Sequence, residues 1–126
     1  MIFDENGKLL TGGDVASVTA MLEGLSVDAI GFNCGLGPEQ MLKLLPELTA
    51  CCSIPIAINP NAGLPVVIDG VTQFNVGPEE FAQKARLLVE EGASLIGGFV
   101  VQPRIIWQNW SRPARICRFS QLLIRI

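Results

Sequence analysis

Four cysteines are the residues of this chain best suited to nucleophilic or metal chemistry: Cys34, Cys51, Cys52 and Cys117. The sequence contains no histidine, which excludes a Ser-His-Asp triad, a Cys-His pair and histidine metal ligands. It contains no tyrosine either, so a metal site would have to use thiolates, carboxylates and amide oxygens. A single cysteine is more often a small buried apolar residue than a reactive one. The four cysteines therefore have to be distinguished by their positions relative to the predicted strands and helices.

Their places relative to the predicted elements separate these cysteines. Cys34 directly follows a predicted strand over residues 28–33, at the end of the strand where parallel sheets carry their active sites. Cys51 and Cys52 fall between a predicted helix and the next strand, at the opposite end, and we interpret them as structural. Cys117 has no second cysteine at metal-ligand spacing. Cys34 is therefore the candidate functional cysteine.

A second candidate segment is the loop of residues 59–63, Asn-Pro-Asn-Ala-Gly, which follows a predicted strand over residues 54–58. Turn-forming residues of this kind can present backbone N–H groups or amide oxygens to a polar ligand, although an ordinary turn has the same composition. A third predicted strand, residues 94–98, ends in two glycines ahead of Phe99 and Val100. The polar ends of the three strands would meet at one edge of a parallel sheet.

Helical segments separate the predicted strands, which indicates an α/β protein with a parallel sheet, either open and doubly wound or closed as a (β/α)8 barrel. Asp14 is a predicted N-cap, and Gly37-Pro38 and Gly77-Pro78 open the next two helices. Asp69-Gly70 between apolar runs predicts a β-hairpin over residues 66–74. No G-x-G-x-x-G turn supports a dinucleotide site. The expected core stripes of the three helices are Val15, Val18, Leu22 and Leu25; Met41, Leu44, Leu45 and Leu48; and Phe81, Ala85 and Leu88.

The charge pattern changes abruptly after Gly98. Residues 1–98 carry twelve acidic and four basic residues, a formal charge of −8, whereas residues 99–126 carry five arginines and no acid, a formal charge of +5. Both tryptophans lie in the second segment. No uninterrupted apolar run approaches the ~20 residues of a membrane span, and the first residues are acidic rather than basic, so we expect a cytoplasmic protein without a membrane partner.

Taken together, several blocks of residues 1–98 resemble the homocysteine S-methyltransferase domain, the homocysteine-binding barrel of cobalamin-dependent methionine synthase and its relatives. The blocks Gly-Phe-Asn-Cys-Gly and Pro-Asn-Ala-Gly-Leu-Pro, in this order and spacing, are specific to that family. The resemblance extends nearly continuously from the first residue to Gly98 and is carried by residues 3–7, 10–12, 28–41, 60–65, 78–82 and 91–98.

The resemblance implies a (β/α)8 barrel, of which residues 1–98 would be the C-terminal half with about three βα units. It implies one Zn²⁺ held by three cysteine thiolates, with Cys34 as the first ligand and Asn61 near the metal as a further candidate ligand. The implied reaction is attack of the homocysteine thiolate on the methyl group of a donor, giving methionine. Cobalamin and methyltetrahydrofolate would act only through other modules. The resemblance does not identify the methyl donor. The residues expected to bind homocysteine are Asn33, Asn59, Asn61, Ala62 and Gly63.

This sequence departs from the family at the place of the other two ligands. A cysteine pair belongs at positions 99 and 100, where Phe99 and Val100 carry no metal donor. We therefore expect that this chain does not retain zinc and is inactive as written. A two-base shift in one possible coding sequence places Cys-Cys-Ala-Thr-Pro directly after Gly98. Our hypothesis is that residues 99–126 are a frame-shifted translation.

Two rival interpretations remain open. Trp107, Trp110 and the arginines of the tail could bind nucleic acid, but without a repeat or a motif we expect no nucleic-acid partner. Alternatively, the chain is a non-catalytic α/β fragment that self-associates, or binds a partner such as the rest of the barrel, through open sheet edges.

Overall fold

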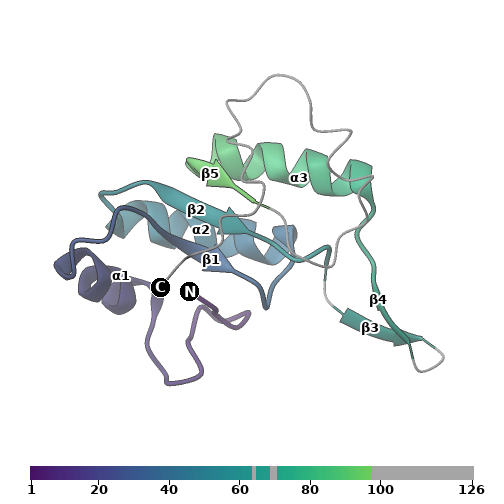
Figure 1. Cartoon of the computed structure of the whole chain (residues 1–126), viewed down its shortest axis with the longest axis horizontal. Helices are drawn as coiled ribbons and strands as arrows, with labels where there is room; N and C mark the ends of the chain where they lie inside the picture. Colours follow the sequence, from purple (N-terminus) through teal and green to yellow (C-terminus); the bar gives the residue numbers. More distant parts are fainter. Residues whose placement is uncertain (64, 69–70, 98–126) are drawn as a thin grey trace, which may run out of the picture.

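The protein is an α/β chain whose helices and strands alternate along most of its length (Figure 1). The computed structural model describes residues 1–63, 65–68 and 71–97. Within these residues, no helix has both the length and the apolar character needed to cross a bilayer. The elements in chain order are α1 (Val15–Gly24), β1 (Ile30–Asn33), α2 (Pro38–Cys51), β2 (Ile56–Asn59), β3 (Pro65–Ile68), β4 (Val71–Phe74), α3 (Pro78–Glu90) and β5 (Leu95–Ile96).

The three predicted strands form one parallel sheet with the order β1-β2-β5. Ile30 pairs with Ile56 and Asn33 with Asn59, and Ile58 pairs with Ile96. Each strand is displaced or shortened relative to the prediction. Met1 lies beside the outer edge of β1, where its carbonyl accepts a hydrogen bond from the Asn33 N–H at 2.8 Å. The parallel α/β class is thus confirmed.

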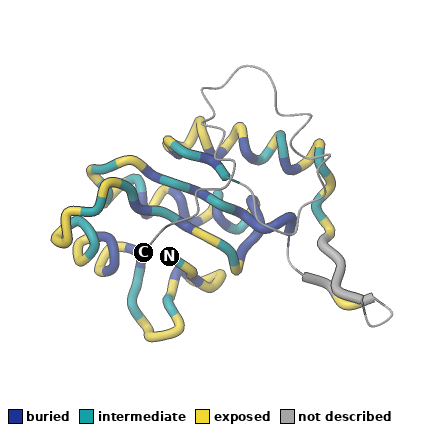
Figure 2. Tube along the Cα trace, in the orientation of Figure 1, coloured by how far each residue is buried: buried dark blue, intermediate teal, exposed yellow. Residues whose placement is uncertain are grey.

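The sheet buries one of its faces in a core that includes residues of all three helices. Buried residues alternate along β1 and β2 with residues that are less buried (Figure 2). Phe32 and Ile58 are buried, whereas Gly31 and Ala57, which directly precede them, are only half-buried. Phe3 packs edge-on against Phe32, with ring centroids 5.5 Å apart. The predicted stripes of α2 and α3 are buried as expected. The core consists of Phe3, Val15, Val18, Ile30, Phe32, Leu36, Met41, Leu44, Leu45, Leu48, Ile56, Ile58, Phe81, Ala85, Leu88, Ala93 and Ile96.

The helices begin where the sequence predicts. The carboxylate of Asp14 accepts a hydrogen bond from the Ser17 N–H at 2.9 Å, and Gly37 and Gly77 are the N-caps of α2 and α3. The prediction for the end of α1 is wrong at one residue: Leu25 is 69% exposed instead of belonging to the core. Because α1 ends at Gly24, the chain leaves the helical path before Leu25 completes the buried stripe.

The predicted hairpin is confirmed by the antiparallel pair β3 and β4, which runs from the Pro65–Phe74 pair to the Ile68–Val71 pair. The hairpin lies between β2 and α3 in the chain, within a strand-to-helix connection. Gly98, the predicted last residue of the third parallel strand, and the turn residues Asp69 and Gly70 lie outside the described residues.

Gly31 permits a close approach of the β1 and β2 backbones, because a side chain there would overlap the carbonyl group of Ala57. We predict that Gly31→Ala lowers the free energy of unfolding by about 3 kcal/mol or more, since two paired strands would have to separate. The matched control is Gly24→Ala at the end of α1, where no atom lies within 4 Å of the added group. That change should be neutral or stabilise by up to about 1 kcal/mol. Urea unfolding of both variants measures the difference, and equal effects would contradict the prediction.

Candidate substrate site at the carboxyl ends of the parallel strands

Three residues form a row across the carboxyl ends of the parallel strands. Asn33 of β1 pairs with Asn59 of β2, and the Gly97 N–H donates to the Ile58 carbonyl at 2.9 Å. A side chain on Gly97 would overlap the amide of Asn59, so this amide extends from β2 over the end of β5. Asn33 is exposed and Asn59 half-buried. The row therefore offers two amide groups to a polar ligand at the predicted edge of the sheet.

Cys34 comes directly after this row and is held in an uncommon backbone conformation. Its φ of 58° lies in the left-handed region, which costs a residue other than glycine about 1 kcal/mol. The Cys34 N–H donates to the Asn59 carbonyl at 3.1 Å, and its own carbonyl accepts from the Leu36 N–H at 2.8 Å. These two bonds hold the backbone of the half-buried Cys34 at the end of β1, where the sequence predicts it.

The loop of residues 59–63 is fastened to the segment that follows Cys34. The Asn61 N–H donates to the Leu36 carbonyl at 3.0 Å, and the Ala62 carbonyl accepts from the Val76 N–H at 3.0 Å. Gly37 faces Gly63 so closely that a side-chain carbon on Gly37 would lie 2.9 Å from the Gly63 Cα. The structure thus places the predicted loop beside the N-terminus of α2, two to three residues from Cys34.

Asn61 is the one buried polar side chain of this loop that is left without a partner. It is 9% exposed, and its Oδ1 accepts no hydrogen bond from any described residue. Leaving a buried acceptor unpaired costs about 1–3 kcal/mol. An oxygen of this kind suits a ligand that brings a hydrogen-bond donor or a cation.

The other cysteines do not join Cys34. Cys51 is the last residue of α2 and its thiol donates to the Glu47 carbonyl at 3.2 Å, while the Cys52 thiol donates to the Ile54 carbonyl at 3.3 Å. Burial raises the pKa of the Cys52 thiol above its usual value, which favours the unreactive protonated form. Among the described residues, no group of three cysteine or carboxylate side chains could hold a metal ion. Phe99, Val100 and Cys117 lie outside the described part of the chain.

Two features of the site are not evident from the sequence. The Leu36 carbonyl holds Asn61, and Gly97 leaves the space into which the Asn59 amide extends. In the sequence, only the glycines at positions 35, 37 and 97 indicate these close contacts. They mark places where backbones or side chains come close, but they do not identify the partner.

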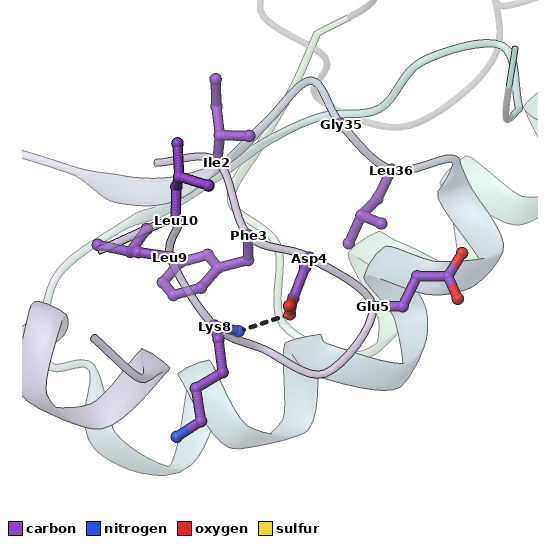
Figure 3. Close-up of a pocket in the computed structure, with 9 residues that line it drawn as sticks. All are labelled: Ile2, Phe3, Asp4, Glu5, Lys8, Leu9, Leu10, Gly35 and Leu36. Carbon is purple, nitrogen blue, oxygen red and sulfur yellow. Dashed lines mark hydrogen bonds between the residues drawn. The ribbon is translucent and has the colours of Figure 1, made fainter. Parts of the chain in front are cut away.

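A separate pocket of about 400 Å³ lies beside the β1–α2 loop, between residues 2–10 and Gly35-Leu36 (Figure 3). Phe3 and Leu36 form part of its apolar lining, and none of the asparagines described above reaches it. The Asp4 carboxylate accepts from the Lys8 N–H at 2.9 Å within its own turn (Figure 3). We therefore assign the candidate chemistry to the row at the strand ends rather than to this pocket.

The unpaired Asn61 oxygen leads to a prediction about stability. Replacing Asn61 by leucine, which has a similar shape, removes the unpaired acceptor and should leave the free energy of unfolding unchanged or higher. Thr19→Val is the matched control, because Thr19 is also buried but its hydroxyl donates to the Val15 carbonyl at 2.7 Å. That variant should lose about 0.5–1.5 kcal/mol. A larger loss for Asn61→Leu than for Thr19→Val in urea unfolding would contradict the interpretation.

Comparison with known proteins assigns the chain to a family. A family model described as homocysteine S-methyltransferase matches residues 1–99. A methionine synthase of Mycobacterium leprae (strain TN) is 38% identical over 96 residues, and one of Mycobacterium tuberculosis (strain ATCC 25618 / H37Rv) is 36% identical over 96 residues. Each match covers 75% of this chain and 8% of the relative, so the chain spans about a twelfth of the length of these curated relatives. The family match covers most of the chain, and the chain belongs to the homocysteine S-methyltransferase family.

Proposed function

We propose that residues 1–98 are the C-terminal half of a (β/α)8 barrel that serves methyl transfer to the sulfur of homocysteine, giving methionine. The parallel sheet supports a barrel because its strands alternate with helices and bury one face against them, as the strands of a (β/α)8 barrel do. A complete barrel needs ~250 residues, so the rest would come from a further segment.

The observation that carries the proposed site is the buried, unpaired Oδ1 of Asn61 beside the segment that follows Cys34. Homocysteine brings an ammonium group and a carboxylate, which amide groups can bind. We propose Asn33, Asn59, Asn61, Ala62 and Gly63 as the residues that bind homocysteine. Cobalamin or methyltetrahydrofolate would act only through other modules.

The donor set of this chain does not fit the zinc ion that the family resemblance implies. A catalytic zinc site takes three protein ligands and keeps a fourth position for substrate. At this site the described residues offer one cysteine sulfur, from Cys34, and one unpaired amide oxygen, from Asn61. Phe99 and Val100 have no donor atoms in their side chains. We therefore propose that the chain does not hold zinc tightly and does not catalyse methyl transfer as written.

A frame-shifted origin of residues 99–126 accounts for the loss of the two ligands. It also accounts for the change from a formal charge of −8 to one of +5 at the same point. Sequencing the coding DNA across codons 95–126 and beyond tests this. A second frame that continues from Gly98 into two cysteine codons is the expected result, and its absence would contradict a frame shift.

A non-catalytic fragment that pairs through open sheet edges is the second candidate. Among the described residues, β5 has a strand on one side only, so its other edge offers unpaired backbone groups. The rest of a barrel, or another copy, would satisfy them.

The metal content of the chain tests the proposed loss of the site. The chain as written should retain well below one Zn²⁺ under competition with a chelator, whereas a Phe99→Cys, Val100→Cys double variant should retain about one. Co²⁺ in that double variant should show thiolate-to-metal absorption, which a further Cys34→Ser change should abolish.

Cys51→Ser and Cys52→Ser are the controls in the same background, because these thiols lie at the far end of α2 and should leave metal binding unchanged. Tight zinc binding by the chain as written, lost in Cys34→Ser, would show that other residues complete the site.

A further inference from the structure

The β3–β4 hairpin has no substantial support from the rest of the described structure. Figure 1 shows it projecting away from the parallel sheet, and no other described element has more than slight contact with either strand. Val67 in β3 is 70% exposed. An isolated two-stranded hairpin is marginally stable in water, while three or more strands can be stable. The hairpin would therefore be stabilised by a further strand.

The pairing register shows which backbone groups of the hairpin point outward. Only two residues separate Ile68 from Val71, so the backbones of these two residues form two hydrogen bonds with each other. Along the hairpin, hydrogen-bonded pairs then alternate with pairs that are not hydrogen-bonded to each other. Val67 and Thr72 consequently direct their N–H and C=O groups away from each other, as do Pro65 and Phe74. Proline has no N–H, so the outer edge of β3 lacks one donor, whereas β4 offers two donors and two acceptors.

The charge distribution favours contact between copies at this place. Residues 1–98 carry a formal charge of −8 and the whole chain one of −3, so the net charges of two copies repel each other. Residues 48–78, which include the hairpin, contain a single charged residue, Asp69. Two copies can therefore approach hairpin to hairpin without bringing many carboxylates together.

We propose that the outer edge of β4 is a self-association site, at which β4 of a second copy of this chain pairs antiparallel to form a four-stranded sheet. With the two-fold axis at Gln73, Thr72 of each copy exchanges hydrogen bonds with Phe74 of the other. Such an interface is self-complementary, as a two-fold dimer requires. The proposal is independent of methyl transfer and of the zinc ligands.

Sedimentation equilibrium of the full, reduced chain over a range of concentrations tests the proposal. The average mass should rise from 13.6 kDa toward twice that value. Thr72→Pro removes one outward donor from each copy and should raise the dissociation constant by about 10- to 100-fold, and Phe74→Pro should do the same. Val67→Pro is the matched control, because it removes the outward donor directly across the hairpin, on the β3 edge.

Hydrogen exchange at the amides of Val66 and Ile68, which point into the hairpin, checks that each proline variant keeps the hairpin. Added salt should strengthen the association, because it screens repulsion between acidic copies. A monomeric parent chain would overturn the proposal. So would an equal or larger effect of Val67→Pro, an association unaffected by Thr72→Pro and Phe74→Pro, or a dimer weakened by salt, which would indicate pairing of acidic residues with the basic tail.

Discussion

The close contact between the backbones of β1 and β2 is the constraint on which the rest of the structure depends. It is possible because Gly31 has no side chain to meet the Ala57 carbonyl. The contact aligns Asn33 with Asn59 and brings the Cys34 N–H to the Asn59 carbonyl. A shift of one residue would move every side chain of a strand to the other face. The register between β1 and β2 therefore determines both which isoleucines are buried and which asparagines lie side by side at the strand ends.

The candidate site built on this pairing is organised by contacts between segments that lie far apart in the chain. Backbone hydrogen bonds hold Cys34 and Asn61 in place. Both residues cost stability, because Cys34 has a left-handed backbone conformation and the buried side-chain oxygen of Asn61 has no hydrogen-bond partner. Costs of this kind are common at functional sites, where a ligand offsets them. Phe99 and Val100, at the positions where the family resemblance implies two further ligands, have no donor atoms in their side chains. The arrangement of Cys34 and Asn61 thus favours a functional site, whereas the side chains at positions 99 and 100 do not favour metal binding.

Among the described residues, the outer edge of β4 is open in the hairpin, as the outer edge of β5 is in the parallel sheet. Both arise from the same physical cause, since a strand satisfies its backbone groups only when strands flank both sides. In a larger assembly, neighbouring segments would cover these edges. Proline at the start of β3 protects one edge of the hairpin, and β4 has no proline.

Much of the fold could be predicted from the sequence because its signals are local. The helix starts at Asp14, Gly37-Pro38 and Gly77-Pro78, the buried stripes of α2 and α3, and the hairpin all depend on residues close together in the chain. Strand limits were predicted less well: the strand expected over residues 28–33 starts at Ile30, and the one expected over 94–98 is Leu95–Ile96 within the described residues. Those limits depend on which residues of a neighbouring strand are available to pair.

The residue types of the site can be read from the sequence: a cysteine and asparagines at strand ends, no histidine, and no side-chain donor at positions 99 and 100. Which of these residues come into contact depends on the folded chain. The Leu36 carbonyl holds Asn61, Gly97 leaves space for the Asn59 amide, and Cys51 and Cys52 remain apart from Cys34. The reason is physical: residue identity fixes which bonds a group can make, whereas the partners come from segments 25 to 38 residues apart that are brought together only when the parallel strands pair.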